Sequence, residues 1–436
     1  MHDHPPVTPR ERLYRIVEDG MCIGCGLCQT VAGSERVRMS EVPDGNLRPL
    51  VAGELDHETV DRIVDVCPGT RVEGLPPEQF DDETRIDTVW GPYRHMVQAW
   101  AADPDVRYRA ATGGVLTALA RFLVGSGRVR FVLHVEGSRR MPGSGEPRLS
   151  FDRADVLAGA ASVYGPAAPL ADIASVLERE EPFAFVGKPC DIAALRNLAR
   201  FDPRVDRLVR YWLTPVCGGY LPPAASADIL RDNGIDPARV TYVRYRGFGC
   251  PGPTRIELDD GSARELGYTD FWPDDESKWS LPFRCKVCPD GIGEAADLAA
   301  ADDWPGGAPD PATMEDDRGT NAVIARTAAG ADLLDAAVRE GWIRLGDVLD
   351  PRHMDATQPH QVKKKLAARA RFDGLLAEGA TVPRTARLRL DALARRHGAE
   401  ANELETQGTR RRVREGRNAE PKPTAARRKP GEPGIP

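Results

Sequence analysis

The chain lacks any apolar run long enough to cross a membrane. Of its 436 residues, 41% are hydrophobic. No stretch approaches the roughly 20 consecutive apolar residues that a membrane-spanning helix needs. The N-terminal residues also lack the charged and then apolar pattern of an export signal. We therefore expect a cytoplasmic protein without a membrane span.

An excess of positive charge is also missing. The sequence has 59 Lys and Arg residues against 66 Asp and Glu residues, for a net charge of −7. Nucleic-acid binding normally depends on a basic surface that neutralises phosphates. The overall charge therefore gives no reason to expect a nucleic-acid partner.

Cysteine is present, but not in the form of a disulfide framework. The nine cysteines are an odd number in a long chain without an export signal. Disulfide scaffolds are typical of short secreted domains with an even number of cysteines. Ligation of a metal or of an iron–sulfur cluster is therefore the favoured interpretation of these residues.

Alternating helix and strand patterns predict an α/β core in the middle of the chain. Apolar runs separated by turn residues indicate a layer of helices around a parallel or mixed sheet. The predicted helices span residues 115–124, 169–178 and 191–200, and the predicted strands span residues 129–135 and 183–186.

Four regions follow from this pattern. We expect an N-terminal cluster segment at residues 10–75, an α/β domain at 90–215, a mixed C-terminal domain at 216–370, and a charged helix with a basic tail at 371–436. The mixed domain contains predicted strands at 240–245 and 255–258. Helical patterns follow at 361–376 and 384–397. From about residue 408 the composition is that of a disordered tail, because it offers little apolar surface to bury.

The string MCIGCGLC at residues 21–28 carries the clearest chemistry. Its C-x2-C-x2-C spacing offers Cys22, Cys25 and Cys28 to one inorganic core, and its glycines let backbone N–H groups approach the sulfides. Cys67, followed by proline, is the candidate fourth ligand, although an insertion of several dozen residues precedes it. A zinc site is the alternative, but zinc sites usually use separated pairs. The spacing favours a [4Fe–4S] cluster.

A second set of cysteines is spread more widely. Cys285 and Cys288 form a C-x2-C pair, which alone fits a zinc half-site, a redox dithiol or an accident. Cys190 opens a predicted helix, where the helix dipole favours a thiolate, and Cys217 precedes two glycines. Cys250 is either a spare cysteine or a replacement for one of the four. Buried apolar thiols are the alternative interpretation.

A glycine pair precedes the predicted helix at 115–124. Thr112 is a candidate N-cap, and Gly113 and Gly114 would free backbone N–H groups to hold a phosphate at the start of the helix. A simple turn would explain the same residues. The string is not GxGxxG, so no Rossmann fingerprint is inferred.

Several strings in the same order resemble the coenzyme F420 hydrogenase/dehydrogenase beta-subunit family. That family also includes a ferredoxin-dependent 7-hydroxymethyl chlorophyll a reductase and an 8-vinyl reductase. The resemblance covers roughly residues 15–370. Its strings are the cysteine triple at 21–28, TGGVLTAL at 112–119, SVYGP at 162–166, GKPCD at 187–191, YRG at 245–247, CKVCPD at 285–290 and ADDW at 301–304.

The resemblance implies FAD and one or two [4Fe–4S] clusters, with Cys190, Cys217, Cys285 and Cys288 holding the second. It gives the Thr-Gly-Gly loop a flavin role, so we expect Thr112, Gly113, Gly114 and Thr117 to hold the FAD phosphates, with Tyr164 and Lys188 near the flavin. Lys188 is the candidate catalytic residue, since a cation could stabilise charge on the reduced flavin. Its position is often threonine in relatives, and a solvated loop lysine is the alternative. Arg246 would hold either an anionic substrate group or an internal carboxylate.

The expected function is electron transfer between coenzyme F420 as hydride substrate and one-electron carriers, because FAD can exchange electrons singly or in pairs. Three alternatives stay open: a ferredoxin-dependent reductase of a conjugated organic substrate, a non-catalytic electron-transfer subunit, and a zinc-binding interaction protein. Ferredoxin or another redox protein is the expected partner, and a homo-oligomer stays open. The histidines show no metal-ligand spacing.

Overall fold

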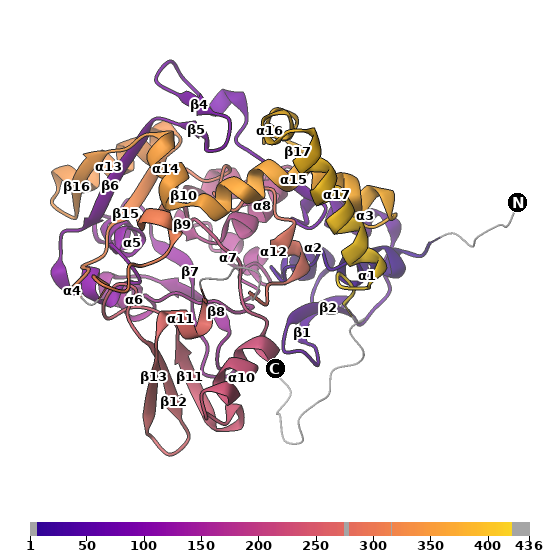
Figure 1. The fold of residues 1–436 in the computed structure, drawn as a ribbon, viewed down its shortest axis with the longest axis horizontal. Helices are drawn as coiled ribbons and strands as arrows, with labels where there is room; N and C mark the ends of the chain where they lie inside the picture. The colour runs from indigo at the N-terminus through magenta and orange to yellow at the C-terminus, as the bar shows by residue number, and fades with distance from the viewer. Residues whose placement is uncertain (1–6, 274–278, 315, 421–436) are drawn as a thin grey trace, which may run out of the picture.

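A computed structural model describes residues 7–273, 279–314 and 316–420. Its centre is an eight-stranded sheet, in the order β16-β6-β15-β14-β10-β9-β7-β8 (Figure 1). The strands are β6 (His95–Ala101), β7 (Phe131–Gly137), β8 (Gly145–Ser150), β9 (Phe183–Val186), β10 (Val209–Pro215), β14 (Leu298–Asp302), β15 (Asn321–Ala325) and β16 (Ile343–Val348). Strands β7, β9, β10 and β14 run parallel, and the other pairings are antiparallel.

Helices cover both faces of this sheet. One face is packed by α5 (Val115–Gly125), α6 (Arg153–Ala158) and α13 (Ala328–Arg339). The other face carries α7 (Ile173–Glu178), α8 (Pro189–Leu198) and α9 (Arg204–Leu208), with α14 (Pro351–Thr357) and α15 (Pro359–Ala377) beside them. A short helix, α4 (Pro104–Arg109), links β6 to α5.

Strand β14 contributes side chains to the apolar clusters on both faces of the sheet. Leu298 and Ala300 contribute to the apolar cluster under α5 and α13, whereas Ala299 and Ala301 face the opposite cluster. Successive side chains in a strand point to opposite faces, so a strand buried on both sides is apolar throughout. The continuous apolar run of this strand is explained by that position.

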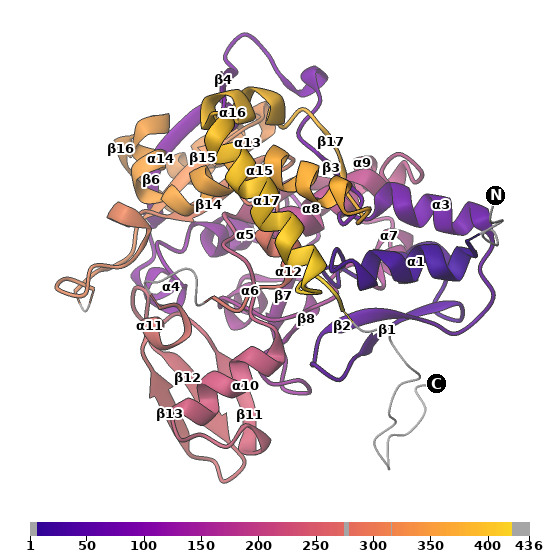
Figure 2. The same cartoon turned by 45° about the vertical axis from the view of Figure 1, so that its right-hand side comes forward.

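Smaller units surround the sheet. A three-stranded antiparallel sheet is formed by β11 (Val240–Arg244), β12 (Thr254–Leu258) and β13 (Ala263–Leu266), with α10 (Pro223–Asp232) and α11 (Tyr268–Phe271) against it. In Figure 2 this unit lies below the main sheet. The N-terminal part contains α1 (Pro9–Glu18), α2 (Leu27–Ala32), α3 (His57–Val66) and the hairpin of β1 (Val37–Glu41) with β2 (Leu47–Val51). A second hairpin joins β4 (Arg85–Asp87) and β5 (Gly91–Tyr93).

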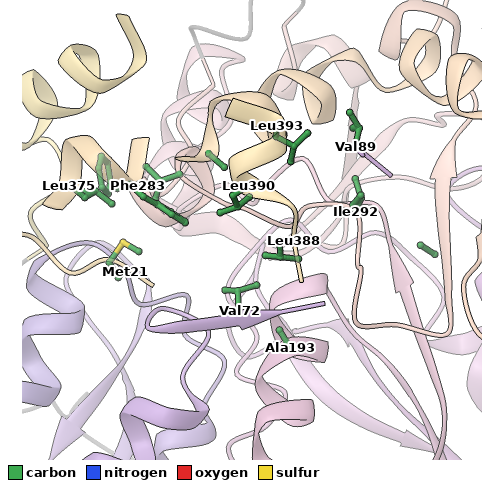
Figure 3. Close-up of a cluster of buried hydrophobic side chains, with 14 of the residues drawn as sticks. Met21, Val72, Val89, Ala193, Phe283, Ile292, Leu375, Leu388, Leu390 and Leu393 are labelled. Carbon is green, nitrogen blue, oxygen red and sulfur yellow. The ribbon is translucent and has the colours of Figure 1, made fainter. Parts of the chain in front are cut away.

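The C-terminal part returns to the N-terminal part. Strand β17 (Arg384–Ala386) pairs in parallel with β3 (Arg71–Glu73), and α16 (Leu390–His397) and α17 (Ala399–Arg414) pack on α15. Figure 3 shows the apolar cluster that joins them, with Met21, Val72, Phe283, Leu375 and Leu388 meeting from segments far apart in sequence. The short helix α12 (Phe283–Lys286) is thereby fixed between the two ends of the chain.

The α/β fold class is confirmed by the mixed sheet and its helices. The main sheet takes strands from both residues 90–215 and residues 216–370, so these two predicted regions share one core. The helix predicted at 169–178 begins only at Ile173, and part of the pattern at 384–397 is strand β17. Disorder does not begin at residue 408, because α17 continues to Arg414; residues 421–436 of the predicted tail lie outside the described residues.

Within the described ranges, we find no helix that combines the length and the apolar character needed to cross a membrane.

Candidate functional site

A cavity of about 390 Å³ lies at the carboxyl ends of the parallel strands. Its lining includes Lys188 after β9, Cys217 after β10, Asp302 at the end of β14, and Thr117 in the first turn of α5. Ligands of open α/β sheets bind in the crevice outside the carboxyl ends of the strands. The position of this cavity is therefore typical of a cofactor site.

The first turn of α5 leaves amide groups free at the cavity. Gly114, the N-cap, has φ of 75° and no side chain of its own to cap the helix, and the first N–H groups have no partner within the helix. Asn321 Oδ1 accepts from Val115 N at 3.2 Å. The next two residues, Leu116 and Thr117, line the cavity. Their amides form the kind of helix N-terminus that binds phosphate.

The two glycines before α5 have different roles. Gly114 lines the cavity in a left-handed conformation, whereas Gly113 does not line it. A Cβ atom on Gly113 would lie 2.8 Å from Asn321 N and 2.9 Å from Ala99 O. Gly113 therefore allows the loop to pack against β6 and β15, and its role in holding a phosphate stays a prediction.

Thr112 is not the N-cap that the sequence predicts. Its hydroxyl donates a short hydrogen bond to Asp302 and accepts one from Arg246 Nη2 at 2.9 Å. Arg246 in turn donates to both carboxylate oxygens of Asp302 and to Ala111 O. The internal-carboxylate alternative for Arg246 is correct. This buried group ties the Thr-Gly-Gly loop to β14, and its charge is already paired.

Lys188 and Asp191 form an ion pair at the cavity wall. Lys188 Nζ donates to Asp191 Oδ2 at 2.6 Å, and Asp191 is fully buried at the first turn of α8. Burial opposes the charge of Lys188, but Asp191 and the thiols of Cys190 and Cys217 raise its pKa above the ordinary value. Asp191 Oδ1 has no hydrogen-bond partner among the described residues. Lys188 is thus a partly buried cation held by Asp191, which argues against the solvated-loop alternative.

Aromatic side chains form the other wall of the cavity. Tyr164 packs edge-on to Trp272 with ring centroids 4.9 Å apart, and Tyr268 packs against Trp304 at 5.5 Å. Trp279 and His360 also line this wall. Flat apolar walls of this kind suit a planar conjugated ligand, because aromatic pairs gain from stacked or edge-to-face contact.

The second set of cysteines gathers next to the cavity. Burial, and then the nearby thiols of Cys285 and Cys288, raise the pKa of Cys217 to about 12. Cys190 does lie in the first turn of α8, but burial and Asp191 raise its pKa well above the ordinary value. The helix dipole therefore does not produce a free thiolate there, and deprotonation of this group requires a ligand that replaces the proton.

The first set encloses a smaller cavity of about 30 Å³. Cys22, Cys25, Cys28 and Cys67 line it together with apolar side chains. Burial raises the pKa of Cys22 to about 11 and that of Cys25 well above its ordinary value, and Cys67 is among the neighbours of both. The insertion before Cys67 is taken up by the β1–β2 hairpin and α3, which end with this residue beside the triple.

The glycines of the triple line the small cavity and have other parts of the chain packed behind them, and their role beside sulfides stays a prediction. Gly24 and Gly26 have φ of 70° and 90°. A Cβ atom on Gly24 would lie 2.6 Å from Leu47 O, and one on Gly26 would lie 2.6 Å from Ala171 N. Both glycines are required by the left-handed conformation and by the chain packed behind the loop.

Cluster ligation by the eight cysteines stays a prediction. Across residues 7–273, 279–314 and 316–420, no group of three or more His, Cys, Asp or Glu side chains could hold a metal ion. A single tetrahedral zinc would need its sulfurs about 3.8 Å apart, from Zn–S bonds of about 2.3 Å. A four-iron core is bound by four thiolates, and all four cysteines of the first set line one cavity.

The three sites follow one another through the protein. Cys217 belongs to the second set and lines the large cavity. Cys190 of the second set and Cys25 of the first set both lie within the electrostatic reach of Asp191. The large cavity therefore adjoins the second set, and the second set adjoins the first.

Cys250 belongs to neither set. It is buried near Arg246 and Asp302, and burial raises its pKa to about 12. The prediction of a spare cysteine fits this position.

Charged groups near the cysteines were not predicted from the sequence. Asp191 pairs with Lys188, and Arg284 and Arg48 lie fully buried near the cysteines. Their adjacency to cysteine was a signal for two of them, since Asp191 follows Cys190 and Arg284 precedes Cys285. Arg48 gave no such signal, because its proximity to Cys22 depends on the fold of the hairpin.

Two family models, a curated relative and a solved structure are similar to this chain. Residues 96–174 match the N-terminal family of the coenzyme F420 hydrogenase/dehydrogenase beta subunit, and residues 180–350 match the family that describes the C terminus of the same subunit. The F420-dependent formate dehydrogenase 1 subunit beta of Methanococcus maripaludis is 25% identical over 252 residues, which are 57% of this chain and 60% of that protein. A chain of the F420-reducing [NiFe] hydrogenase complex from Methanosarcina barkeri is 19% identical, with a TM-score of 0.47, covering 64% of this chain and 94% of that chain.

Proposed function

Since the chain belongs to the coenzyme F420 hydrogenase/dehydrogenase beta-subunit family, we propose that it is an F420-dependent oxidoreductase. It passes electrons between F420, as a hydride carrier, and one-electron carriers, using FAD and two [4Fe–4S] clusters. The observation that carries the proposal is the adjacency of the sites: Cys217 lines the large cavity, and the second cysteine set adjoins the first.

The large cavity fits a flavin nucleotide. FAD would supply the exchange between a two-electron hydride and single electrons. The amides of Leu116 and Thr117 would hold a phosphate at the start of α5, where no side chain competes for them. Asn321 fixes that turn through Val115 N. The remaining part of the cavity, lined by Tyr164 and other aromatic groups, excludes water from a planar ring.

Lys188 is the candidate catalytic residue in this site. Its ammonium group lies at the cavity wall and is held by Asp191 at 2.6 Å. A cation fixed in a water-poor site stabilises negative charge as it develops, without reorganisation during the reaction. Lys188 therefore favours the reduced state of a flavin and, because it is also close to Cys190 and Cys217, of the adjoining site.

The cysteines would each lose a proton on ligating iron, because a thiolate is the ligand. In the structure all nine are free thiols and none forms a disulfide. Buried neutral thiols arranged around two centres fit ligation better than oxidation to disulfides. Such thiols persist in the reducing cytoplasm, which we propose as the compartment.

A redox partner protein is part of the proposal. The Methanococcus maripaludis relative is named as a subunit of a formate dehydrogenase, and the match spans 60% of its length. By analogy, this chain would exchange single electrons with ferredoxin or with another redox protein, through the first cysteine set. The large cavity is lined by Cys217 of the second set and by no cysteine of the first among the described residues.

Cofactor content tests the proposal. The chain is purified without oxygen, and iron, sulfide and flavin are quantified in the wild type and in Cys67→Ser, Cys288→Ser and Cys250→Ser. We expect about eight irons and one FAD, consistent with two four-iron clusters. Cys67→Ser and Cys288→Ser should each lose iron from one site, and Cys250→Ser should keep all of it. Zinc in place of iron, with no flavin, would contradict the proposal.

A further inference from the structure

Arg284 links the two cysteine sets directly. It lies on α12, immediately before Cys285, and is only 2% exposed. Its Nη2 and Nε atoms donate to the carbonyl oxygen of Pro68 at 2.8 and 3.3 Å. Pro68 follows Cys67, the fourth cysteine of the first set. A side chain adjacent to Cys285 therefore donates hydrogen bonds to the backbone adjacent to Cys67.

The same guanidinium group interacts electrostatically with thiols of both sets. Its surroundings include Cys288, Cys190 and Cys285 of the second set, and it also acts on Cys67 of the first. Among the described carboxylates, none lies within ion-pair distance of Arg284. A buried charge is costly unless an opposite charge accompanies it. The groups in place to supply that charge are the cysteines of the two sets, once they are thiolates.

Arg48 shows the contrasting case. It is also fully buried, and it lies near Cys22, but Nε and Nη2 donate to the two carboxylate oxygens of Glu420 at 2.5 and 2.9 Å. The charge of Arg48 is neutralised by a carboxylate. The charge of Arg284 would be neutralised by thiolates of the cysteine sites.

We propose that Arg284 is a positioning residue shared by the two cysteine sites, fixing their separation through the Pro68 carbonyl and supplying one positive charge that stabilises the reduced state of each. The inference rests on the proposed function, which provides the two redox centres. When one electron leaves one site and arrives at the other, the first is oxidised and the second is reduced. The electron stays beside the same cation throughout, so no proton has to move to balance its charge.

The test is a redox titration of the anaerobically purified full chain, followed by electron paramagnetic resonance. Arg284→Gln removes the charge and retains a donor for Pro68. We expect it to keep wild-type iron and to shift both reduction steps to more negative potentials. Arg326→Gln is the matched control, because Arg326 is equally buried and donates to the carbonyls of Trp90, Pro92 and Ile292. It should leave both potentials unchanged.

Each outcome decides the proposal. A shift of one reduction step alone, or of neither, would overturn the shared role. If Arg284→Gln fails to load iron, Arg284→Lys decides: it keeps the charge but cannot donate twice to Pro68 from a planar group. Because the charge is retained, it should load iron with both potentials close to the wild-type values, and a large negative shift of either step with the charge retained would overturn the proposal. A wild type with fewer than two reducible sites would overturn the proposed function as well, which separates the two failures.

Discussion

The Lys188–Asp191 pair offers a quantitative test of the cavity wall. In Lys188→Met, Asp191 loses its cation while its side chain stays 0% exposed, and its Oδ1 atom already has no partner among the described residues. Removing one partner of a buried ion pair costs about 3–5 kcal/mol, because the other charge stays buried and unpaired. Since the Lys188 side chain is 20% exposed, we expect the lower end of this range, about 3 kcal/mol.

Urea denaturation of the anaerobically purified protein measures this free energy of unfolding. Arg231→Met is the matched control, because Arg231 and Asp228 form an ion pair at the same i,i+3 spacing on a helix, with side chains 60% and 72% exposed. An exposed pair contributes about 0.2–1 kcal/mol. The double variant Lys188→Met with Asp191→Asn removes both charges, and it should recover most of the loss. A cost for Lys188→Met no greater than that of the control would refute the reasoning.

Two further predictions concern the flavin loop and the response to acid. Gly114→Ala places a side chain at φ of 75°, which costs about 1–2 kcal/mol for a residue other than glycine, and it should lower the flavin content measured by absorbance. Burial and the nearby Arg148 lower the pKa of His134 to about 4. A histidine with an unfolded pKa of about 6.5 then binds more protons when the chain unfolds, so stability should fall as pH decreases from about 6.5 to 4. His134→Gln should flatten the dependence of the melting temperature on pH across that window, and an unchanged slope would contradict the assignment.

Local patterns were enough to predict much of the core. The strand at residues 183–186 and the helices near 115–124 and 191–200 are found close to the predicted positions. Their apolar periodicity is set by burial against the sheet, which acts along each element. Likewise, the C-x2-C-x2-C spacing predicted a shared site for three cysteines, with Cys67 as the fourth. In the structure these four residues line one cavity.

The elements that local patterns did not predict correctly depend on contacts between distant parts of the chain. Residues 384–386 form strand β17 because they pair with β3, more than 300 residues earlier in the chain. Helix α7 begins late because Leu170 N donates to Cys25 O, which holds that segment against the cysteine loop. Helix α17 is ordered by contacts with α15, including the Arg371–Glu405 ion pair. None of these partners is visible from local composition.

The same reason explains the corrected residue roles. Thr112 had the sequence context of an N-cap, but Asp302 and Arg246 compete for its hydroxyl from distant segments. The dipole of α8 favours a thiolate at Cys190, yet burial has the larger effect on its pKa. Spacing indicates which residue types can meet, whereas the fold determines which of them are already occupied.

The central claim is that the two electrons of a hydride from F420 would pass through a flavin in the cavity, one at a time, to both cysteine sites. Its most direct test is to add reduced F420 to the anaerobic, cofactor-loaded chain and to follow the visible spectrum. The account predicts that the flavin and the iron–sulfur absorbance both bleach. The same cofactors with no response to reduced F420 would contradict it, and activity with ferredoxin and a conjugated organic substrate would then identify a reductase on the same fold.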